Sequence, residues 1–380
     1  MKRPTHTLKP RSRIVIKIGT NLLTDQRSGI KRERIREIAR SVRTMQGSGH
    51  QFVVVSSGAI GAGSAALGGV RRLKSIVQKQ AAAAVGQPVL MEAYQSAFRE
   101  RGGSVAQVLL TKDDFNSRTR YLNAKRTFSI LLERGVVPVV NENDTVAVDE
   151  IKLGDNDNLS ALVAGLIEAD LLIILSDIDG LYTDDPARND SATLISVVES
   201  VSPQIELLAK RTRNELSTGG MITKIQAAKR CTAMGIAMII ANGENPVVLD
   251  QIFSGDFRGT LFLPEESRLS LRKKWIGFVS HTSGTVTIDS GAQLALQRRH
   301  TSLLPSGILE VSGEFKAGDT ISIKDAAGLE IAKGLSAFSS SDLRKIKGRK
   351  TGAIREILGH LSHEEAVHKD NLVLTPVKAI

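Results

Sequence analysis

Short apolar runs alternate with longer helix-like segments from the amino terminus to about residue 265. Runs of Val, Ile and Leu that end in small or polar residues are typical of buried strands. Such runs cover residues 13–18, 52–55, 105–110, 136–140, 171–175 and 236–241. Segments with helical periodicity cover residues 35–45, 76–101, 117–134, the region from 159 onward, and 221–234. This alternation predicts an α/β fold with a mainly parallel, open sheet covered by helices, which residues 259–264 close.

Residues 138–162 carry two clusters of acidic and amide side chains. Residues 141–144 (NEND) follow a predicted strand, and residues 155–158 (DNDN) begin a predicted helix. The alternating apolar residues between them predict a small hairpin. One such cluster is more simply explained as a turn or a helix cap, because Asp and Asn favour both positions. Two clusters so close together, each beside an apolar element, favour a ligand site at one edge of the sheet.

Lysines and glycines at other element ends indicate a bound phosphate group. Lys17 lies near the end of an apolar strand, where open α/β sheets bind ligands, although an edge-strand lysine that reaches solvent has the same pattern. Residues 56–63 (SSGAIGAG) would let a ligand approach the backbone, but they match neither a P-loop nor a dinucleotide-binding fingerprint. A tight turn is the alternative there. Lys224 follows a Gly-Gly turn in the first turn of a helix, where the helix dipole favours an anion rather than a lysine. We therefore expect Lys224 to share a phosphate group with the helix amides.

The composition changes near residue 265, where charged residues begin to cluster around Trp275. From residue 284 onward, short alternating segments bounded by Gly, Asp or Ser predict a small, mostly-β barrel or sandwich. The predicted organisation is a domain at residues 1–265, a linker at 266–283 and a second domain with a tail at 284–380.

Composition and charge limit the partners and the compartment. A formal charge of +11 favours polyanions, either nucleic acid or phosphate-bearing substrates, and the basic run at residues 344–350 is also common on ordinary surfaces. The single cysteine, Cys231, cannot form an internal disulfide, and the amino terminus lacks the apolar core of a signal peptide. No apolar run reaches the roughly 18 residues of a membrane span, and the histidines lack the spacing of zinc ligands. We expect a cytoplasmic protein with no membrane contact and no metal site of its own.

Several segments, in this order, resemble the amino acid kinase family. They are IVIKIGT, VVVSSGAIGAG, NENDTVA, KLGDNDNLSA, SDIDGLYTDDP and STGGMITK. The NEND and GDNDN pair is most similar to the glutamate 5-kinase branch of that family. Residues from about 284 to 350 are similar, through less specific motifs, to the RNA-associated PUA domain that many members of this branch carry.

The resemblance implies a three-layer αβα sandwich that transfers a phosphoryl group from ATP, with Mg²⁺, to the side-chain carboxylate of L-glutamate. Lys17 and Lys224 would contact phosphate groups and neutralise charge in the transition state, and Asp157 would orient both lysines and the metal-bound phosphates. Substrate contacts would come from Ser57, Asp144 and Asn156. The nucleotide site would be lined by Lys17, Ser176, Asp177, Thr218, Gly219, Gly220, Met221, Ile222, Thr223 and Lys224.

The chemistry of the residues agrees with this reaction. A glutamate carboxylate has an ordinary pKa of about 4.3, so it is ionised at neutral pH and needs no general base. The difficulty is that one anion must approach another, which two lysines and Mg²⁺ would relieve. Gly19 and Gly58 would add amide donors to the phosphate groups. Asp144 or the segment from Asp155 to Asp157 would hold the substrate ammonium group.

Two alternatives and several partners remain open. The nearest rival is a kinase of the same fold that acts on another acid, such as aspartate or N-acetylglutamate. The second is an RNA-binding protein with an inactive kinase-like domain, although Lys17, Asp157 and Lys224 are all present. The resemblance also implies feedback inhibition by proline, with residues 145–153 as the discriminating loop. It further implies a homodimer or homotetramer and a functional link to glutamyl phosphate reductase.

Overall fold

The structure is a computed structural model that describes residues 8–25, 29–67, 73, 75–146, 156–211, 220–265, 273, 276–277, 282–299, 301–358 and 364–375. The chain forms two compact units. One contains Met1–Asp114 and Thr119–Ser267, and the other contains Phe115–Arg118 and Arg268–Ile380. Each unit has its own sheet and its own buried apolar core. Within the described ranges, none of the helices combines the length and the hydropathy that a membrane span requires.

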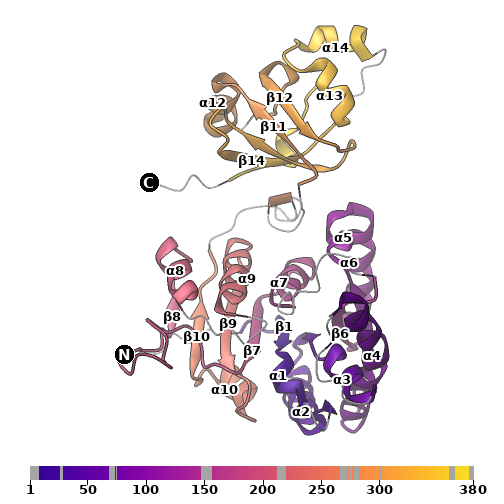
Figure 1. The fold of residues 1–380 in the computed structure, drawn as a ribbon, viewed down its shortest axis with the longest axis vertical. Helices are drawn as coiled ribbons and strands as arrows, with labels where there is room; N and C mark the ends of the chain where they lie inside the picture. The colour runs from indigo at the N-terminus through magenta and orange to yellow at the C-terminus, as the bar shows by residue number, and fades with distance from the viewer. Residues whose placement is uncertain are drawn as a thin grey trace. The chain divides into compact units, whose positions relative to one another are not determined.

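The first unit is built on an eight-stranded sheet with the order β5-β6-β4-β1-β7-β9-β10-β8 (Figure 1). The strands are β1 (Arg13–Ile18), β4 (Gln51–Ser56), β5 (Val105–Leu110), β6 (Val137–Glu142), β7 (Leu171–Ser176), β8 (Val197–Val198), β9 (Ala237–Asn242) and β10 (Gly259–Phe262). Every neighbouring pair from β5 to β9 is parallel, as the sequence predicts. The carboxyl ends of these strands therefore meet at one edge of the sheet. A separate two-stranded ribbon joins β2 (Thr24–Asp25) to β3 (Gly29–Ile30).

The far edge of the sheet differs from the prediction. The strand predicted at residues 259–264 is present as β10 and is the last strand of this sheet along the chain, but it is not the edge strand. It is antiparallel to β9, and the short strand β8 pairs with its outer side. The N–H of Leu261 donates to Ser196 O at 2.9 Å, and the N–H of Leu263 donates to Val198 O at 3.0 Å. A strand of two residues is too short to show an alternating pattern, which explains why the sequence does not reveal it.

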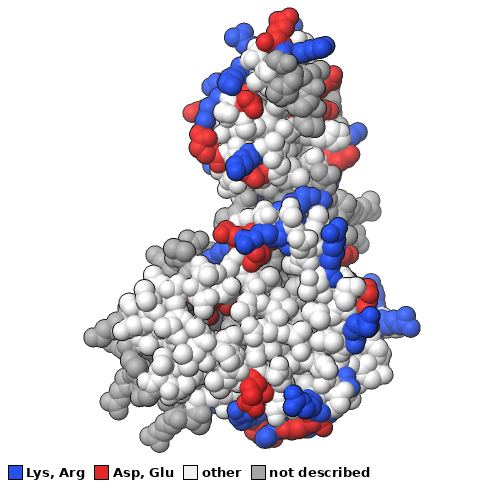
Figure 2. All heavy atoms as spheres, turned by 90° about the vertical axis from the view of Figure 1, so that its right-hand side faces the viewer, with Lys and Arg blue, Asp and Glu red and all other residues white. Residues whose placement is uncertain are grey.

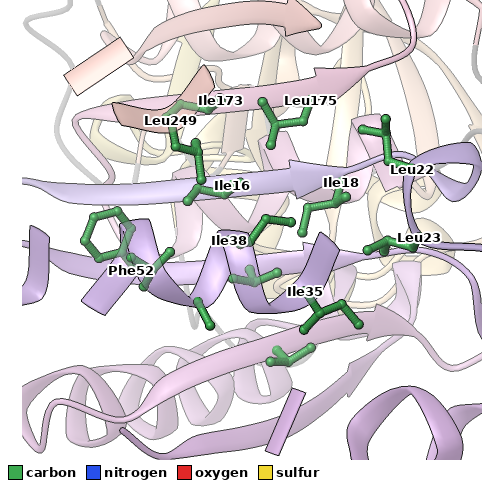
Figure 3. Packing of buried hydrophobic residues seen from close by; sticks show 14 of the residues in the cluster. Ile16, Ile18, Leu22, Leu23, Ile35, Ile38, Phe52, Ile173, Leu175 and Leu249 are labelled. Carbon is green, nitrogen blue, oxygen red and sulfur yellow. The ribbon is translucent and has the colours of Figure 1, made fainter. Parts of the chain in front are cut away.

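Helices cover both faces of the sheet and form the three layers that the resemblance implies. The helices along this part of the chain are α1 (Thr20–Leu23), α2 (Arg32–Gly47), α3 (Ala59–Ala66), α4 (Ile76–Arg99), α5 (Lys112–Asn116), α6 (Arg118–Glu133), α7 (Asn156–Leu166), α8 (Pro203–Arg211), α9 (Met221–Ala233) and α10 (Val248–Ser254). Helices α1, α2, α4 and α10 contribute to one apolar core with one face of the strands (Figure 3). On the other face, α7 contacts β1, β4, β6 and β7, and α9 contacts β9 and α7.

Strand β1 shows how the core places a charged side chain. Ile14, Ile16 and Ile18 lie in the core to which α2 contributes, and Ile16 and Ile18 are labelled in Figure 3. Side chains alternate along a strand, so Lys17 projects to the opposite face, toward α7 and α9. Lys17 is only 5% exposed there. Burial of the apolar residues of β1 therefore fixes the direction of a buried ammonium group.

Helices α3 and α4 cross with their backbones in contact. A Cβ atom on Gly63 would overlap the carbonyl oxygen of Ala82, and one on Gly86 would overlap the carbonyl oxygen of Ala59. The start of α4 is fixed by a capping box in which Ser75 and Gln78 exchange side-chain and backbone hydrogen bonds. The crossing holds α4 against the segment that follows β4, beside the carboxyl edge of the sheet.

The second unit contains a five-stranded sheet with the order β12-β11-β13-β14-β15. Its strands are β11 (Gly284–Ile288), β12 (Ile308–Gly313), β13 (Thr320–Lys324), β14 (Glu330–Leu335) and β15 (Leu372–Leu374). Its helices are α12 (Ser290–Arg299), α13 (Ser340–Ile346) and α14 (Thr351–Leu358), with 3-10 turns η2 (Pro305–Gly307) and η3 (Lys369–Asn371). The predicted β segments are all present, and β15 is additional. Alternate residues of these strands, such as Ile321 and Ile323, are fully buried.

The predicted basic run in this unit is partly neutralised. Arg344 forms an ion pair with Glu314 at 2.7 Å, and Lys345 lies 3.5 Å from Asp342. Lys347, Arg349 and Lys350 are exposed. On the face shown in Figure 2, basic and acidic side chains are interspersed over this unit.

We predict that Gly86→Ala destabilises the first unit, because its methyl group would meet the backbone of Ala59 and force α3 and α4 apart. The expected loss is about 1–3 kcal/mol, the usual range for an overpacked core. The free energy of unfolding from chemical denaturation, followed by circular dichroism, measures it.

Gly47→Ala is the matched control. Gly47 is also helical, and a Cβ there has no atom within 4 Å. Ala at this position should leave stability unchanged or raise it slightly. Equal stability of both variants would show that the crossing tolerates a side chain.

Candidate active site

Four of the parallel strands, β1, β4, β6 and β7, deliver the segments that follow them to one edge of the sheet. Gly19 follows β1, Ser57 follows β4, Asp144 follows β6 and Asp177 follows β7. Helices α7 and α9 begin on the face of the sheet to which Lys17 projects. Open parallel sheets bind ligands at this edge. Several predicted site residues are therefore brought to one place, although they are far apart in the sequence.

A buried cluster of Lys17, Asp157 and Lys224 occupies this edge. Lys17 Nζ lies 2.7 Å from Asp157 Oδ1, and Lys224 Nζ lies 3.3 Å from Asp157 Oδ2. Asp157 is fully buried, and Lys224 is 2% exposed. Thr223 Oγ1 donates a further hydrogen bond to Asp157 Oδ2 at 2.6 Å. The predicted catalytic trio is thus one connected group contributed by β1, α7 and α9.

Burial and charge act in opposite directions on this cluster. Burial alone would raise the pKa of Asp157, but the ammonium groups of Lys17 and Lys224 and the hydroxyl of Thr223 lower it below its ordinary value. Burial lowers the pKa of Lys224, an effect that Asp157 opposes and Lys17 reinforces. With both lysines protonated, the three groups carry one net positive charge in a poorly solvated place. Such a site favours an anionic ligand.

A second group of polar side chains adjoins the first through the start of α7. Asn156 precedes Asp157, and its Nδ2 donates to Ser57 Oγ at 2.9 Å and to Ser56 O at 3.1 Å. The same Nδ2 lies 3.2 Å from Asn141 Oδ1, at the end of β6. The predicted substrate residues Ser57 and Asn156 are therefore in direct contact. One helix start contributes to both groups.

Asp144 lies just beyond the end of β6 and is half-buried. Burial raises the pKa of its carboxyl group to about 6. No ion pair involving Asp144 is found among the described residues. A half-buried carboxylate of this kind suits a cationic ligand group.

The predicted nucleotide residues lie after β7 and at the start of α9. Ser176 Oγ donates to Asp177 Oδ1 at 3.1 Å, and Asn21 Nδ2 donates to Asp177 Oδ2 at 3.1 Å. Burial alone would raise the pKa of Asp177, but these hydrogen bonds lower it below its ordinary value. Gly220 caps α9; Met221 is buried and Ile222 is exposed.

The two glycines predicted to donate amides differ. Gly58 has a left-handed backbone (φ +106°), caps α3, and its N–H has no partner in the part of the chain that the structure describes. The N–H of Gly19 instead donates to Leu175 O at 3.1 Å. Gly19 is therefore not a free phosphate donor in this structure, because its amide extends the hydrogen-bond ladder between the parallel strands β1 and β7.

Some predicted residues cannot be placed. Asp155, Thr218, Gly219 and most of the loop at residues 145–153 lie outside the described residues. Conversely, two contacts are not predicted from the sequence: the hydroxyl of Thr223 donates to Asp157, and the side-chain amide of Asn21 donates to Asp177. These bonds join segments far apart in sequence, and only the general polarity of the loops hinted at them.

Models of two known families match the chain. The amino acid kinase family matches residues 12–242, and the PUA domain matches residues 284–358. The first range contains every strand of the eight-stranded sheet except β10, and the second contains every strand of the five-stranded sheet except β15.

Curated relatives cover almost the whole chain. The glutamate 5-kinase of Thermoanaerobacter sp. (strain X514) is 48% identical over 95% of this chain and 97% of its own. That of Moorella thermoacetica is 46% identical over 95% and 96%, and that of Geobacter metallireducens is 47% identical over 97% and 99%. The chain therefore belongs to the amino acid kinase family, as a member of its glutamate 5-kinase branch with a carboxyl-terminal PUA domain.

Proposed function

We propose that this kinase transfers the γ-phosphoryl group of ATP to the side-chain carboxylate of L-glutamate, giving ADP and L-glutamyl 5-phosphate, the step that opens proline biosynthesis. The carrying observation is that the buried Lys17–Asp157–Lys224 cluster adjoins the Asn156–Ser57 pair. The lysine–aspartate cluster would hold the phosphate groups, and the Asn156–Ser57 pair would hold the acceptor. The names of the curated relatives support the same substrate.

The reaction requires neutralisation of negative charge and does not require a general base. The acceptor carboxylate is already ionised at neutral pH. Its oxygen attacks the γ-phosphorus, and the bond from that phosphorus to the bridging oxygen of ADP breaks. Lys17 and Lys224 would stabilise the negative charge on the transferring group and on the leaving ADP oxygen. Asp157 would keep both ammonium groups aimed at one place, because it contacts each of them.

Mg²⁺ fits this site as a companion of the nucleotide. Among the described residues, no three His, Cys, Asp or Glu side chains gather into a metal site. Mg²⁺ is commonly bound through substrate phosphates with one or two carboxylates. Asp177, whose pKa is lowered, is a suitable carboxylate near the nucleotide segment. When bound, the ion would neutralise charge on the phosphate groups.

The acceptor side favours an amino acid with a free ammonium group. Asp144 supplies a half-buried carboxylate, and Asn156 and Ser57 supply hydrogen-bonding groups. Asp155 is proposed as a further contact. N-acetylglutamate has no ammonium group for Asp144, and aspartate is one methylene shorter. These differences favour glutamate over both rivals.

Further partners rest on family membership. Proline, which shares the ammonium and carboxylate groups of glutamate, is proposed as a feedback inhibitor acting through residues 145–153. Such inhibition would raise the glutamate KM in the kinase assay.

We also propose a homodimer or homotetramer, which light scattering would test. We further propose that the labile product passes directly to glutamyl phosphate reductase. RNA binding by the PUA domain is proposed through the exposed Lys347, Arg349 and Lys350, and a salt-dependent shift of labelled tRNA would reveal it.

An assay of ATP-dependent acyl phosphate, trapped with hydroxylamine, tests the proposed reaction. Glutamate, aspartate and N-acetylglutamate are offered separately with Mg²⁺. We expect hydroxamate with glutamate alone. A signal with another acid would be consistent with the proposed role of the lysine–aspartate cluster but would contradict the proposed acceptor contacts. Folded protein without a signal for any acid would favour the RNA-binding alternative.

Lys224→Ala should lower kcat at least 100-fold, because one of the two ammonium groups that neutralise the transferring phosphate is removed. Lys229→Ala is the matched control: Lys229 lies on the same helix, but its side chain is half-exposed and pairs with Glu206 at the surface. The control should keep normal turnover. Circular dichroism checks that both variants fold, and near-normal kcat of Lys224→Ala would remove Lys224 from the mechanism.

The pH dependence of kcat/KM tests Asp144. The carboxylate form binds the substrate ammonium, and the pKa of the free group is about 6. As the pH falls through this value the group becomes neutral, so kcat/KM for glutamate should fall about tenfold per pH unit below it. Asp144→Asn should have a low and flat kcat/KM over this range, whereas the exposed control Asp190→Asn should keep the wild-type profile. An unchanged profile of Asp144→Asn would reject the assignment.

A further inference from the structure

Helix α4 places one polar side chain, Gln87, in the buried region behind the acceptor site. Gln87 is 8% exposed, and its Oε1 accepts a hydrogen bond from Asn141 Nδ2 at 3.0 Å. Its own Nε2 is buried, and within the described ranges it has no hydrogen-bond partner. A buried donor without a partner destabilises a fold, so the amide of Gln87 is not explained by stability.

The backbone fixes the direction of the Asn141 amide. The N–H of Glu142 donates to Asn141 Oδ1 at 2.9 Å, and a backbone N–H can only donate. The oxygen of Asn141 is thereby identified, and its nitrogen must face Gln87. The atom of Gln87 that faces Asn141 is then the acceptor Oε1, and the unpaired atom is the donor.

The same reasoning fixes the amide of Asn156. The atom of Asn156 in this network faces Ser56 O and Asn141 Oδ1, which both accept, so it must be the donor Nδ2. Its Oδ1 is left, and no partner for that oxygen is found in the part of the chain that the structure describes. A hydrogen-bond acceptor therefore remains at the start of α7, beside Ser57 and next to Asp157.

We propose that Gln87 is a positioning residue for the acceptor amino acid. By holding Asn141 Nδ2, Gln87 keeps Asn141 Oδ1 turned toward Asn156, and Asn156 Oδ1 is then presented to the α-ammonium group of the substrate. Gln87 acts through the two asparagines and does not itself touch the substrate, because its free nitrogen is buried. This inference rests on the proposed function and adds a specificity role for α4.

The helix crossing explains why Gln87 is so precisely held. The preceding residue, Gly86, approaches the carbonyl of Ala59 too closely for any side chain. The backbone of α4 at this point is therefore fixed against α3, whose first residues follow Ser57 and Gly58 directly. A side chain at position 87 starts from a fixed point and reaches the end of β6.

Gln87→Met tests the inference, because it keeps the length of the side chain and removes both the acceptor and the unpaired donor. We expect the KM for glutamate to rise roughly tenfold. The KM for ATP and kcat should stay within about twofold, and Tm should be unchanged or higher. Glutarate, which lacks the α-ammonium group, should inhibit the variant and the wild type with the same Ki. A change in the glutarate Ki as large as that in the glutamate KM would overturn the role in presenting Asn156 Oδ1.

Gln87→Glu is the conservative variant. It restores an acceptor for Asn141 Nδ2 without restoring the amide donor, so its glutamate KM should return to within about threefold of wild type. Gln95→Met is the matched control on the exposed face of the same helix and should change nothing. The inference fails if Gln87→Met keeps the wild-type KM, if Gln87→Glu is no better than Gln87→Met, or if kcat and both KM values worsen together with Tm.

Wild-type turnover separates the two possible failures. If the wild-type protein makes no hydroxamate from glutamate, the proposed function itself is rejected. If the wild type uses glutamate and Gln87→Met behaves identically, only the role of Gln87 is rejected. In a protein that already carries Asn141→Ala, adding Gln87→Met should not raise the glutamate KM further, because the effect of Gln87 passes through Asn141.

Discussion

The carboxylate of Asp157 has to stay ionised in a place with almost no solvent, and that requirement links three elements of the fold. Burial opposes the charge, while the ammonium groups of Lys17 and Lys224 stabilise it. Strand β1 must therefore turn one lysine to the α7 face, and α9 must bring another to the same point. The apolar residues of the opposite core hold β1 in that orientation. Packing and the geometry of the charged cluster are joined here, because the same strand alternation that buries Ile16 and Ile18 directs Lys17 to Asp157.

Much of this arrangement could be predicted from the sequence. Continuous apolar runs mark the central parallel strands because both of their faces are covered, and their polar ends mark the ligand edge. Lys17 and Lys224 stand out because an apolar strand and a helix start do not favour a lysine, and Asp157 stands out because it belongs to one of two neighbouring clusters of acidic and amide residues. The short strand β8 was missed because two residues carry no period, and its pairing with the outer side of β10 was therefore not predicted.

Other features depend on contacts that a linear pattern does not contain. Gln87 lies in an alanine-rich helix and looks like any polar residue there, but the crossing at Gly63 and Gly86 brings it to the end of β6. Thr223 and Asn21 gain their partners only when distant segments meet. Gly19 was predicted as a phosphate donor, yet its amide is used by Leu175. In each case the deciding partner is far away along the chain.

The consecutive positions of Asn156 and Asp157 at the start of α7 have a consequence for how this enzyme can change. The residue proposed to contact the acceptor and the residue proposed to organise the phosphate groups share one helix start. With these proposed roles, any shift of that helix would alter substrate preference and catalytic rate together, so substitutions in α7 would not change one property without the other. New acceptors would have to be accommodated from the opposite wall, formed by the segments after β4 and β6. Divergence of substrate choice within this architecture should therefore be concentrated in those segments, while the helix start is kept.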